Sequence, residues 1–195
     1  PADGFTPLHF QHFVVTTSAR LYAGHSAQAY QQVEQTWQRV RHSYLPQLDA
    51  VAVMLHQLRA RAALALATHS PSAESERLRK LARKLATSLG HSNLAHALAL
   101  RHLVDANLSV LEGAPERAEN HCKRAAEIFD AADMQLMREV AYYARAALRG
   151  DHGAQPDRRR AEAFFAQVGV RAPAAFTAAW FPALRERLLR LAQLA

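Results

Sequence analysis

The sequence predicts an all-α fold, arranged as a right-handed stack of about four helical hairpins with short helices at the C-terminal end. Three observations predict it. Half of the 195 residues are hydrophobic and only seven are glycine, a composition typical of a helical globular protein. Apolar residues recur with a period near 3.6 in one segment after another. Glycine or proline stands at most segment ends, where helices stop and start.

The central hairpin has the clearest pattern, with the turn Glu112-Gly113-Ala114-Pro115 between two helices. The first helix is apolar on all sides, which predicts neighbours on several sides: Leu98, Leu100, Leu103, Val104, Leu108, Val110 and Leu111. The second has one inner face, mostly of small residues: Ala118, Cys122, Ala125, Phe129 and Ala132. Small residues let two helices approach closely, so we expect a tight antiparallel pair.

Three further helices are expected before this hairpin, and a fourth leads into it. The first begins at Pro7 after Thr6 and stops at Gly24, and the second runs from Ser26 to about Tyr44. The third begins at Pro46, and the fourth follows the turn His69 to Ser72 and closes at Gly90. Their expected inner faces are Ala29, Val33, Trp37 and Val40; then Leu48, Val51, Ala52, Leu55, Leu58, Ala62 and Leu66; then Leu78, Leu81, Ala82, Leu85 and Leu89.

After the hairpin, Asp133 is expected to cap a seventh helix that ends at Gly150, with a core face of Met137, Val140, Ala141, Ala144 and Leu148. Residues 1–150 are thus the predicted repeats, and residues 151–195 a C-terminal helical cap of the same domain. The cap comprises a loop (151–156), a helix from Pro156 to Gln167, and two short helices separated at Pro182, the last ending near Leu194. Its aromatic residues are expected to cover the last hairpin rather than to form a ligand pocket: Phe164, Phe165, Phe176, Trp180 and Phe181.

Two helix ends share a spacing. Gly24 precedes Ala29 by five residues, and Gly113 precedes Ala118 by the same five. This spacing resembles the tetratricopeptide repeat (TPR), in which a small residue of the second helix contacts the first helix. The units starting at Thr6, Pro46, Ser92 and Asp133 are about forty residues long, against about 34 in the standard repeat. The resemblance therefore implies degenerate, TPR-like repeats forming an α–α superhelix.

Longer strings resemble one group of proteins. They are Leu21-Tyr22-Ala23-Gly24 with Ala29 and Trp37, the run 58–64, the run 125–134, and Gly169-Val170-Arg171-Ala172-Pro173. Together they are similar to the C-terminal helical region of bacterial multidomain serine/threonine protein kinases, which join a kinase domain, an ATPase module and TPR-like repeats. The resemblance implies a protein-interaction or regulatory segment of a signalling kinase.

The chain lacks the sequence signatures of kinase and ATPase chemistry. It has no glycine-rich loop after a strand, no His-Arg-Asp catalytic loop, no Asp-Phe-Gly and no Gly-Lys-Thr or Gly-Lys-Ser. We therefore expect this segment not to be an enzyme and to need no cofactor. Its one cysteine, Cys122, excludes a disulfide framework and is expected to pack as a small hydrophobic residue.

The 11 histidines could indicate a metal site, but their spacing does not favour one. His9 and His12 share a helix face without a carboxylate three or four residues on, and His91, His96 and His102 do not share a face. Solvent-facing histidines are the favoured interpretation, with no metal bound.

A net charge of +7 and a pI near 10.2 indicate an acidic partner or a nucleic acid. The basic groups lie in three helices: Arg77, Arg79, Lys80, Arg83 and Lys84; Arg158, Arg159 and Arg160; and Arg185, Arg187 and Arg190. A basic helical nucleic-acid-binding domain is the alternative function, disfavoured because no docking helix of known type or exposed aromatic platform is evident. Charged residues interrupt the apolar runs, so we expect a cytoplasmic protein without a membrane span.

The favoured binding site is a groove along the faces of the odd-numbered helices opposite their cores. Its expected residues are His12, Arg20, His56, Arg59, Arg101, Asp105, Arg138, Tyr142, Arg145 and Arg149. Arginine and tyrosine often anchor interfaces, so the expected partner is a protein or peptide, acidic if it opposes these charges. A plain solvated surface is an equally good interpretation of the same residues.

Overall fold

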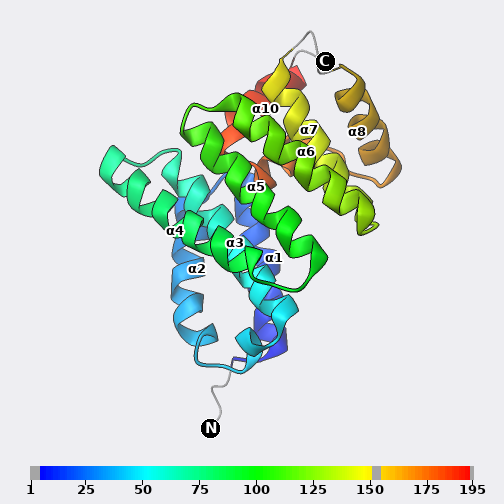
Figure 1. The fold of residues 1–195 in the computed structure, drawn as a ribbon. Helices are drawn as coiled ribbons and strands as arrows, with labels where there is room; N and C mark the ends of the chain where they lie inside the picture. Colours follow the sequence, from blue (N-terminus) through cyan, green and yellow to red (C-terminus); the bar gives the residue numbers. More distant parts are fainter. Residues whose placement is uncertain (1–4, 151–154, 194–195) are drawn as a thin grey trace.

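The computed structural model describes residues 5–150 and 155–193, and every regular element within these ranges is helical (Figure 1). The predicted all-α class is therefore confirmed. In chain order the elements are α1 (Pro7–Ala23), α2 (Ser26–Val40), the 3-10 turn η1 (Leu45–Gln47), α3 (Asp49–Ala67), α4 (Ser72–Gly90), α5 (Ala95–Leu111), α6 (Pro115–Ala131), α7 (Gln135–Arg149), α8 (Gln155–Gln167), α9 (Pro173–Trp180), the 3-10 turn η2 (Pro182–Leu184) and α10 (Arg185–Gln193).

Consecutive helices pack against one another from α1 through α8. The pairing follows the sequence order because the connections are short, which brings each helix back alongside the one before it. The central hairpin, α5 and α6, lies side by side in Figure 1 and has the expected turn at its end.

Local signals set several helix ends as predicted. The Thr6 hydroxyl accepts from the His9 amide at the start of α1, and the ring of His9 accepts in return from the Thr6 amide. Gly113 has a φ of 72° after α5, where a residue with a Cβ would be strained. Its amide donates to the Val110 carbonyl and the next amide donates to the Ser109 carbonyl, so the last turn of α5 is satisfied.

Asp133 does not cap α7, contrary to prediction. It has a φ of 55° and ends α6, where its amide donates to the Asp130 carbonyl. The residue before α7 is Met134, without a side-chain cap. Aspartate tolerates the left-handed conformation better than most residues, so it takes the place that glycine occupies after α5.

The connection from α2 to α3 also differs from prediction. α2 ends at Val40, because the Ser43 hydroxyl donates to the Val40 carbonyl and accepts from the Leu45 amide, which favours a turn over continued helix. Pro46 lies in η1, so α3 begins three residues later than expected. Leu48 then precedes the helix and is 50% exposed, and its predicted inward position is wrong.

The largest core is formed by residues of the helices from α3 through α10, and many of these residues are alanines. The expected stripe of α6 is fully buried at Ala118, Cys122, Ala125 and Phe129. The predicted core face of α7 is buried at all five positions. A second core joins α1, α2 and part of α3. Among the expected core residues of α5, Leu98 is 43% exposed and Val110 and Leu111 are only half-buried.

The C-terminal segment does more than cover the last hairpin. α9 contacts both α1 and α7, η2 contacts α3 and α5, and α10 contacts α7. Phe181 and Leu188 are fully buried there. The segment therefore runs back along one face of the odd-numbered helices, and the prediction of a cap on the last hairpin alone is too narrow. Residues 151–154 of the predicted loop and the expected end near Leu194 lie outside the described residues, whereas Gln155 and Pro156 belong to α8.

Among the described residues, one helix is long and apolar enough to cross a membrane by length and composition alone. This helix is α3, Asp49–Ala67, with a mean hydropathy of 1.2 over an 18-residue window. Some 61% of that window is buried inside the protein, as is usual for a core helix.

Candidate functional site

The four expected groove residues of α7 form an arginine–tyrosine stripe, Arg138, Tyr142, Arg145 and Arg149, whose last two arginines reach both α6 and α8. The Arg149 guanidinium donates to the Glu119 carboxylate of α6 at 2.6 Å. Arg145 lies 3.3 Å from the Asp157 carboxylate of α8 and 3.7 Å from that of Glu119. These arginines therefore join three helices, and they are not a row of unopposed charges.

Arg138 and Tyr142 also have structural contacts. Arg138 donates to Glu139 at 2.8 Å and forms an ion pair with Asp130. Glu139 is fully buried and receives a second guanidinium, that of Arg160, at 3.0 Å. The Arg160 guanidinium also lies 4.7 Å from the centre of the Tyr142 ring. The α7 stripe is therefore not a plain solvated surface, the other interpretation that the sequence allowed, because the buried Glu139 carboxylate is paired with Arg138.

Three of the expected groove residues of the earlier helices contact α2, the helix beside them. Arg59 forms a two-pronged pair with Glu34 at 2.7 and 2.9 Å, and Arg20 donates to Gln32 at 2.6 Å. His56 lies against the ring of Trp37 on α2, with 6.3 Å between ring centres. His12 is exposed. The two remaining residues, Arg101 and Asp105 of α5, form an ion pair at 3.4 Å.

The face that the C-terminal segment covers carries different residues. Arg61 of α3 is 5% exposed, donates to the Ala179 carbonyl at 3.2 Å and stacks on Trp180 with 4.0 Å to the ring centre. Burial lowers the pKa of Arg61 to about 9, which still leaves the guanidinium charged at neutral pH. Asn107 of α5 donates to the Trp180 carbonyl at 3.1 Å and accepts from the Ala183 amide at 3.1 Å. Sequence reasoning missed both residues.

A groove of about 500 Å³ opens where α10 and η2 cross the ends of α3, α5 and α7. One wall is apolar, and the rim is basic. The residues that line it are Thr68, His69, Val110, Leu111, Pro115, Leu148, Pro182, Ala183, Leu184, Arg185, Glu186, Arg187 and Arg190. We refer to it as the helix-end groove. The three arginines were noted in the sequence only as a basic helix, since nothing local shows which helix ends α10 meets.

Two of these arginines complete helix ends. Arg185 donates to the carbonyls of Leu21 and Tyr22 at 3.2 and 3.1 Å, in the last turn of α1. Arg187 donates to the Leu148 carbonyl at the end of α7 at 3.0 Å. The last carbonyls of a helix lack intrahelical partners and carry partial negative charge, which favours cations there. Three arginines against one glutamate leave the groove lining with two net positive charges.

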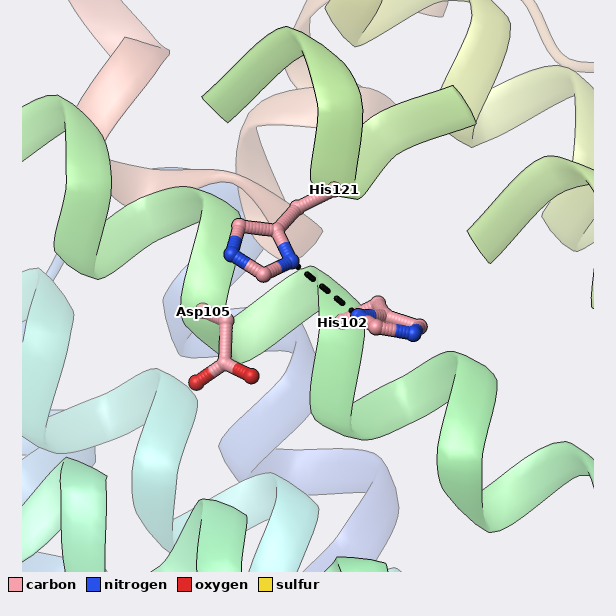
Figure 2. Close-up of side chains that lie close together, drawn as sticks. All are labelled: His102, Asp105 and His121. Atoms are coloured by element: carbon pink, nitrogen blue, oxygen red, sulfur yellow. Dashed lines mark hydrogen bonds between the residues drawn. The ribbon is translucent and has the colours of Figure 1, made fainter. Parts of the chain in front are cut away.

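A second constellation lies on the α5–α6 seam. His102 and Asp105 come from α5 and His121 from α6, and their potential ligand atoms lie within 4.8 Å of one another. Figure 2 shows the two imidazoles facing each other, with the Asp105 carboxylate beside them. The Nδ1 atoms of the two rings are 3.0 Å apart, so one ring donates to the other. Burial, more than the neighbouring charges, lowers the pKa of both imidazoles.

Sequence spacing missed this cluster because it compared histidines within single helices. His102 and Asp105 are three residues apart, which places them on one face of α5. His121 lies 16 residues after Asp105 and comes close to His102 and Asp105 only because α6 packs against α5. His91, His96 and His102 are not brought together as a metal-ligand set in the part of the chain that the structure describes, and His9 contacts Thr6.

Cys122 lies next to His121 in sequence but points about 100° away around α6 and is fully buried in the core. Burial raises the pKa of its thiol far above the usual range. A thiol that stays protonated is a poor nucleophile. This arrangement agrees with its expected role as a small hydrophobic residue.

Carboxylates partner much of the basic surface noted in the sequence. On α4, Arg77 pairs with Glu74 at 2.6 Å and Arg79 with Glu76 at 3.0 Å, while Arg83 reaches both Glu76 and Glu112. These contacts reduce the local positive potential that a phosphate backbone would meet.

No protein-family model, curated protein or solved structure matches this chain.

Proposed function

We propose that the chain is a non-catalytic protein-interaction module with TPR-like repeats, serving as a regulatory part of a bacterial signalling serine/threonine kinase. One observation supports an interaction role above others: the helix-end groove combines an apolar wall with a basic rim. The wall includes Val110, Leu111 and Leu148, and the rim carries Arg190, which is 69% exposed. The kinase context rests on the sequence resemblance.

The occupant that fits this groove is a short acidic peptide segment of a partner protein with at least one apolar side chain. An apolar side chain would bury surface against Val110 and Leu111, at about 25 cal/mol per Å² removed from water. Carboxylates of the same segment would face the arginines of α10. Charge complementarity of this kind sets specificity and association rate more than affinity.

This placement differs from the groove first expected along the odd-numbered helices. In the structure the arginine–tyrosine stripe of α7 forms ion pairs with α6 and α8. The C-terminal segment covers a different face of the odd-numbered helices. The helix-end groove is made by that C-terminal segment, so the same residues that close the fold create it.

Binding of labelled peptides to the purified protein tests the proposal. Fluorescence anisotropy would compare an acidic peptide rich in glutamate and leucine with a basic peptide and a single-stranded oligonucleotide of equal length. We expect the acidic peptide to bind and the Arg190→Glu change to weaken it by at least about tenfold, since an attraction becomes a repulsion. Arg159→Glu, an equal charge change at an exposed position of α8, is the matched control and should leave binding unchanged.

Three results would contradict the proposal. Equal loss of peptide binding in Arg190→Glu and Arg159→Glu would show general charge attraction and not a groove. Tighter binding of the oligonucleotide with a steep salt dependence would favour the nucleic-acid alternative. Phosphoryl transfer or ATP hydrolysis that copurifies with the chain would overturn the non-catalytic assignment.

A further inference from the structure

We propose that His102, Asp105 and His121 form a binding site for a divalent transition-metal ion of the zinc class, across the α5–α6 seam. The inference goes beyond the interaction role and does not depend on it, since the three residues are not part of the helix-end groove lining.

The first argument is the distance between donors. Tetrahedral ligands at zinc bond lengths of about 2.0–2.1 Å lie about 3.3 Å from one another. The two Nδ1 atoms are 3.0 Å apart, and all three ligand atoms lie within 4.8 Å of each other. Side-chain rotation is enough to close these distances, so the set can surround one ion without movement of either helix.

The second argument is the rigidity of the seam. Each helix contributes ligands, and the two helices pack on each other in a core where Ala118, Cys122 and Ala125 of α6 are fully buried. Ligands on packed helices lose little freedom on binding, which favours a preorganised site. The three ligand residues are half-buried, so an ion can enter from solvent.

The third argument is the chemistry of the donors. Two imidazole nitrogens and one carboxylate oxygen suit zinc and its first-row neighbours, whereas calcium and magnesium prefer oxygen alone. Each ring would bind through Nδ1 and carry its proton on Nε2, so the ring that now donates changes tautomer without releasing a proton. Three protein ligands leave a fourth position for water or for a partner's side chain.

Neighbouring cations set a limit on affinity. Arg101 lies 3.4 Å from the Asp105 carboxylate and would have to withdraw, which its 44% exposure allows. Arg117 forms an ion pair with Glu112 and donates to the Ser109 hydroxyl, and Arg124 of α6 is exposed. These positive charges oppose a bound dication, so we expect an affinity below that of a closed structural zinc site.

Cobalt binding to the full chain tests the inference, because four-coordinate Co²⁺ absorbs visible light and Co²⁺ in water does so only weakly. We expect one equivalent of Co²⁺ to produce this band and Zn²⁺ to displace it. His102→Asn and His121→Asn should each weaken cobalt binding by at least about tenfold. Even a change to a residue that only hydrogen-bonds to a metal ligand lowers metal affinity by about 10- to 100-fold. His96→Asn, which lies on α5 with His102 but outside the cluster, is the control.

Circular dichroism would confirm that each variant is folded, and Asp105→Asn, which keeps the side-chain shape, replaces any histidine variant that is not. Absence of the band in the folded protein would overturn the inference, leaving an imidazole–imidazole hydrogen bond as the whole role of the pair. A band that persists in the His102→Asn/His121→Asn double variant would assign the ion to other histidines and overturn it equally.

Discussion

Small side chains on α6 determine how closely two helices approach. Ala118, Cys122 and Ala125 are fully buried in the core that α6 shares with α5 and α7, and each is small enough to allow close packing of the helices. Interiors are close-packed, so even one added methylene is felt at such positions. At the residue scale, the volume of these side chains therefore decides the geometry of the hairpin and of the histidine cluster that it carries.

Replacing Ala125 with leucine should overpack the α5–α6 seam. We expect a loss of about 1–3 kcal/mol of unfolding free energy, measured by thermal denaturation. Ala131→Leu, at an exposed position of the same helix, is the control and should change stability little. An unchanged melting temperature in Ala125→Leu would contradict the close packing of this face.

His56 should make stability depend on pH. Burial lowers its pKa below the ordinary 6.5, and the charge of Arg59 adds to the effect. The unfolded chain then binds a proton more readily than the folded one, so the contribution of His56 is fully present above about pH 6.5 and is lost as the pH falls through the lowered pKa. Denaturant unfolding at several pH values should show a shallower decline in His56→Gln than in the wild type. An identical pH dependence in the two proteins would contradict this role.

At the scale of elements, one buried amide connects α5 to the C-terminal segment. Asn107 is 1% exposed and bonds the carbonyls of Leu103 and Trp180 and the amide of Ala183. Asn107→Ala would leave the last two backbone groups without this partner. We expect a loss of about 2–4 kcal/mol in chemical denaturation, because a buried polar group without a partner costs about 1–3 kcal/mol.

The control for that substitution is Asn120→Ala, which removes an exposed amide from α6. Its effect should stay within about 0.5 kcal/mol. Equal stability of the two variants would mean that the bonds of Asn107 contribute nothing to holding the C-terminal segment.

The α7 stripe allows a second prediction at this scale. Arg138→Glu would place a carboxylate beside Glu139, which is fully buried. Breaking a buried ion pair is strongly destabilising, so we expect a loss of about 3 kcal/mol or more. Thermal unfolding of Arg138→Glu beside Arg159→Glu, an exposed reversal, measures the difference. If Arg138→Glu keeps the wild-type melting temperature, the stripe is a free surface and the first expected groove again becomes the better proposal.

For the whole molecule, the C-terminal segment joins the two ends of the chain. Arg185 of α10 bonds carbonyls of α1 that are more than 160 residues away, and Arg61 of α3 bonds α9. α9 contacts α1, and η2 contacts α3 and α5. The segment therefore joins the core around α1 and α2 to the larger core.

Removal of residues 172–195 should therefore prevent cooperative folding. It would expose the apolar faces of the odd-numbered helices, which bind a dye such as ANS when tertiary packing is lost. We expect helical far-UV circular dichroism with a weakened near-UV signal and a broad melting transition. A sharp transition with little dye binding would show instead that the stack of α1 to α8 is stable without this segment.

The amino-acid sequence by itself determined the helix faces and helix ends that depend on residues close together in the chain. The apolar period of α5 to α7 predicted most of their core faces, and Gly24 and Gly113 predicted two helix ends through the positive φ that glycine accepts. The small-residue stripe of α6 predicted its buried face. At Ser43 and Asp133 the helix boundary differs from the prediction, because the Ser43 hydroxyl bonds the end of α2 and Asp133 adopts the left-handed conformation after α6.

Tertiary structure decided everything that depends on which surfaces meet. The Asn107 contacts span more than 70 residues and those of Arg185 more than 160, and no local pattern encodes such partners. The same reason explains why the stripe of α7 forms ion pairs between helices and why His121 joins His102 and Asp105. Helix periodicity fixes a side chain's direction around its own axis, but only the packing of the whole chain decides whether that direction leads to solvent, to a carboxylate or to a second imidazole.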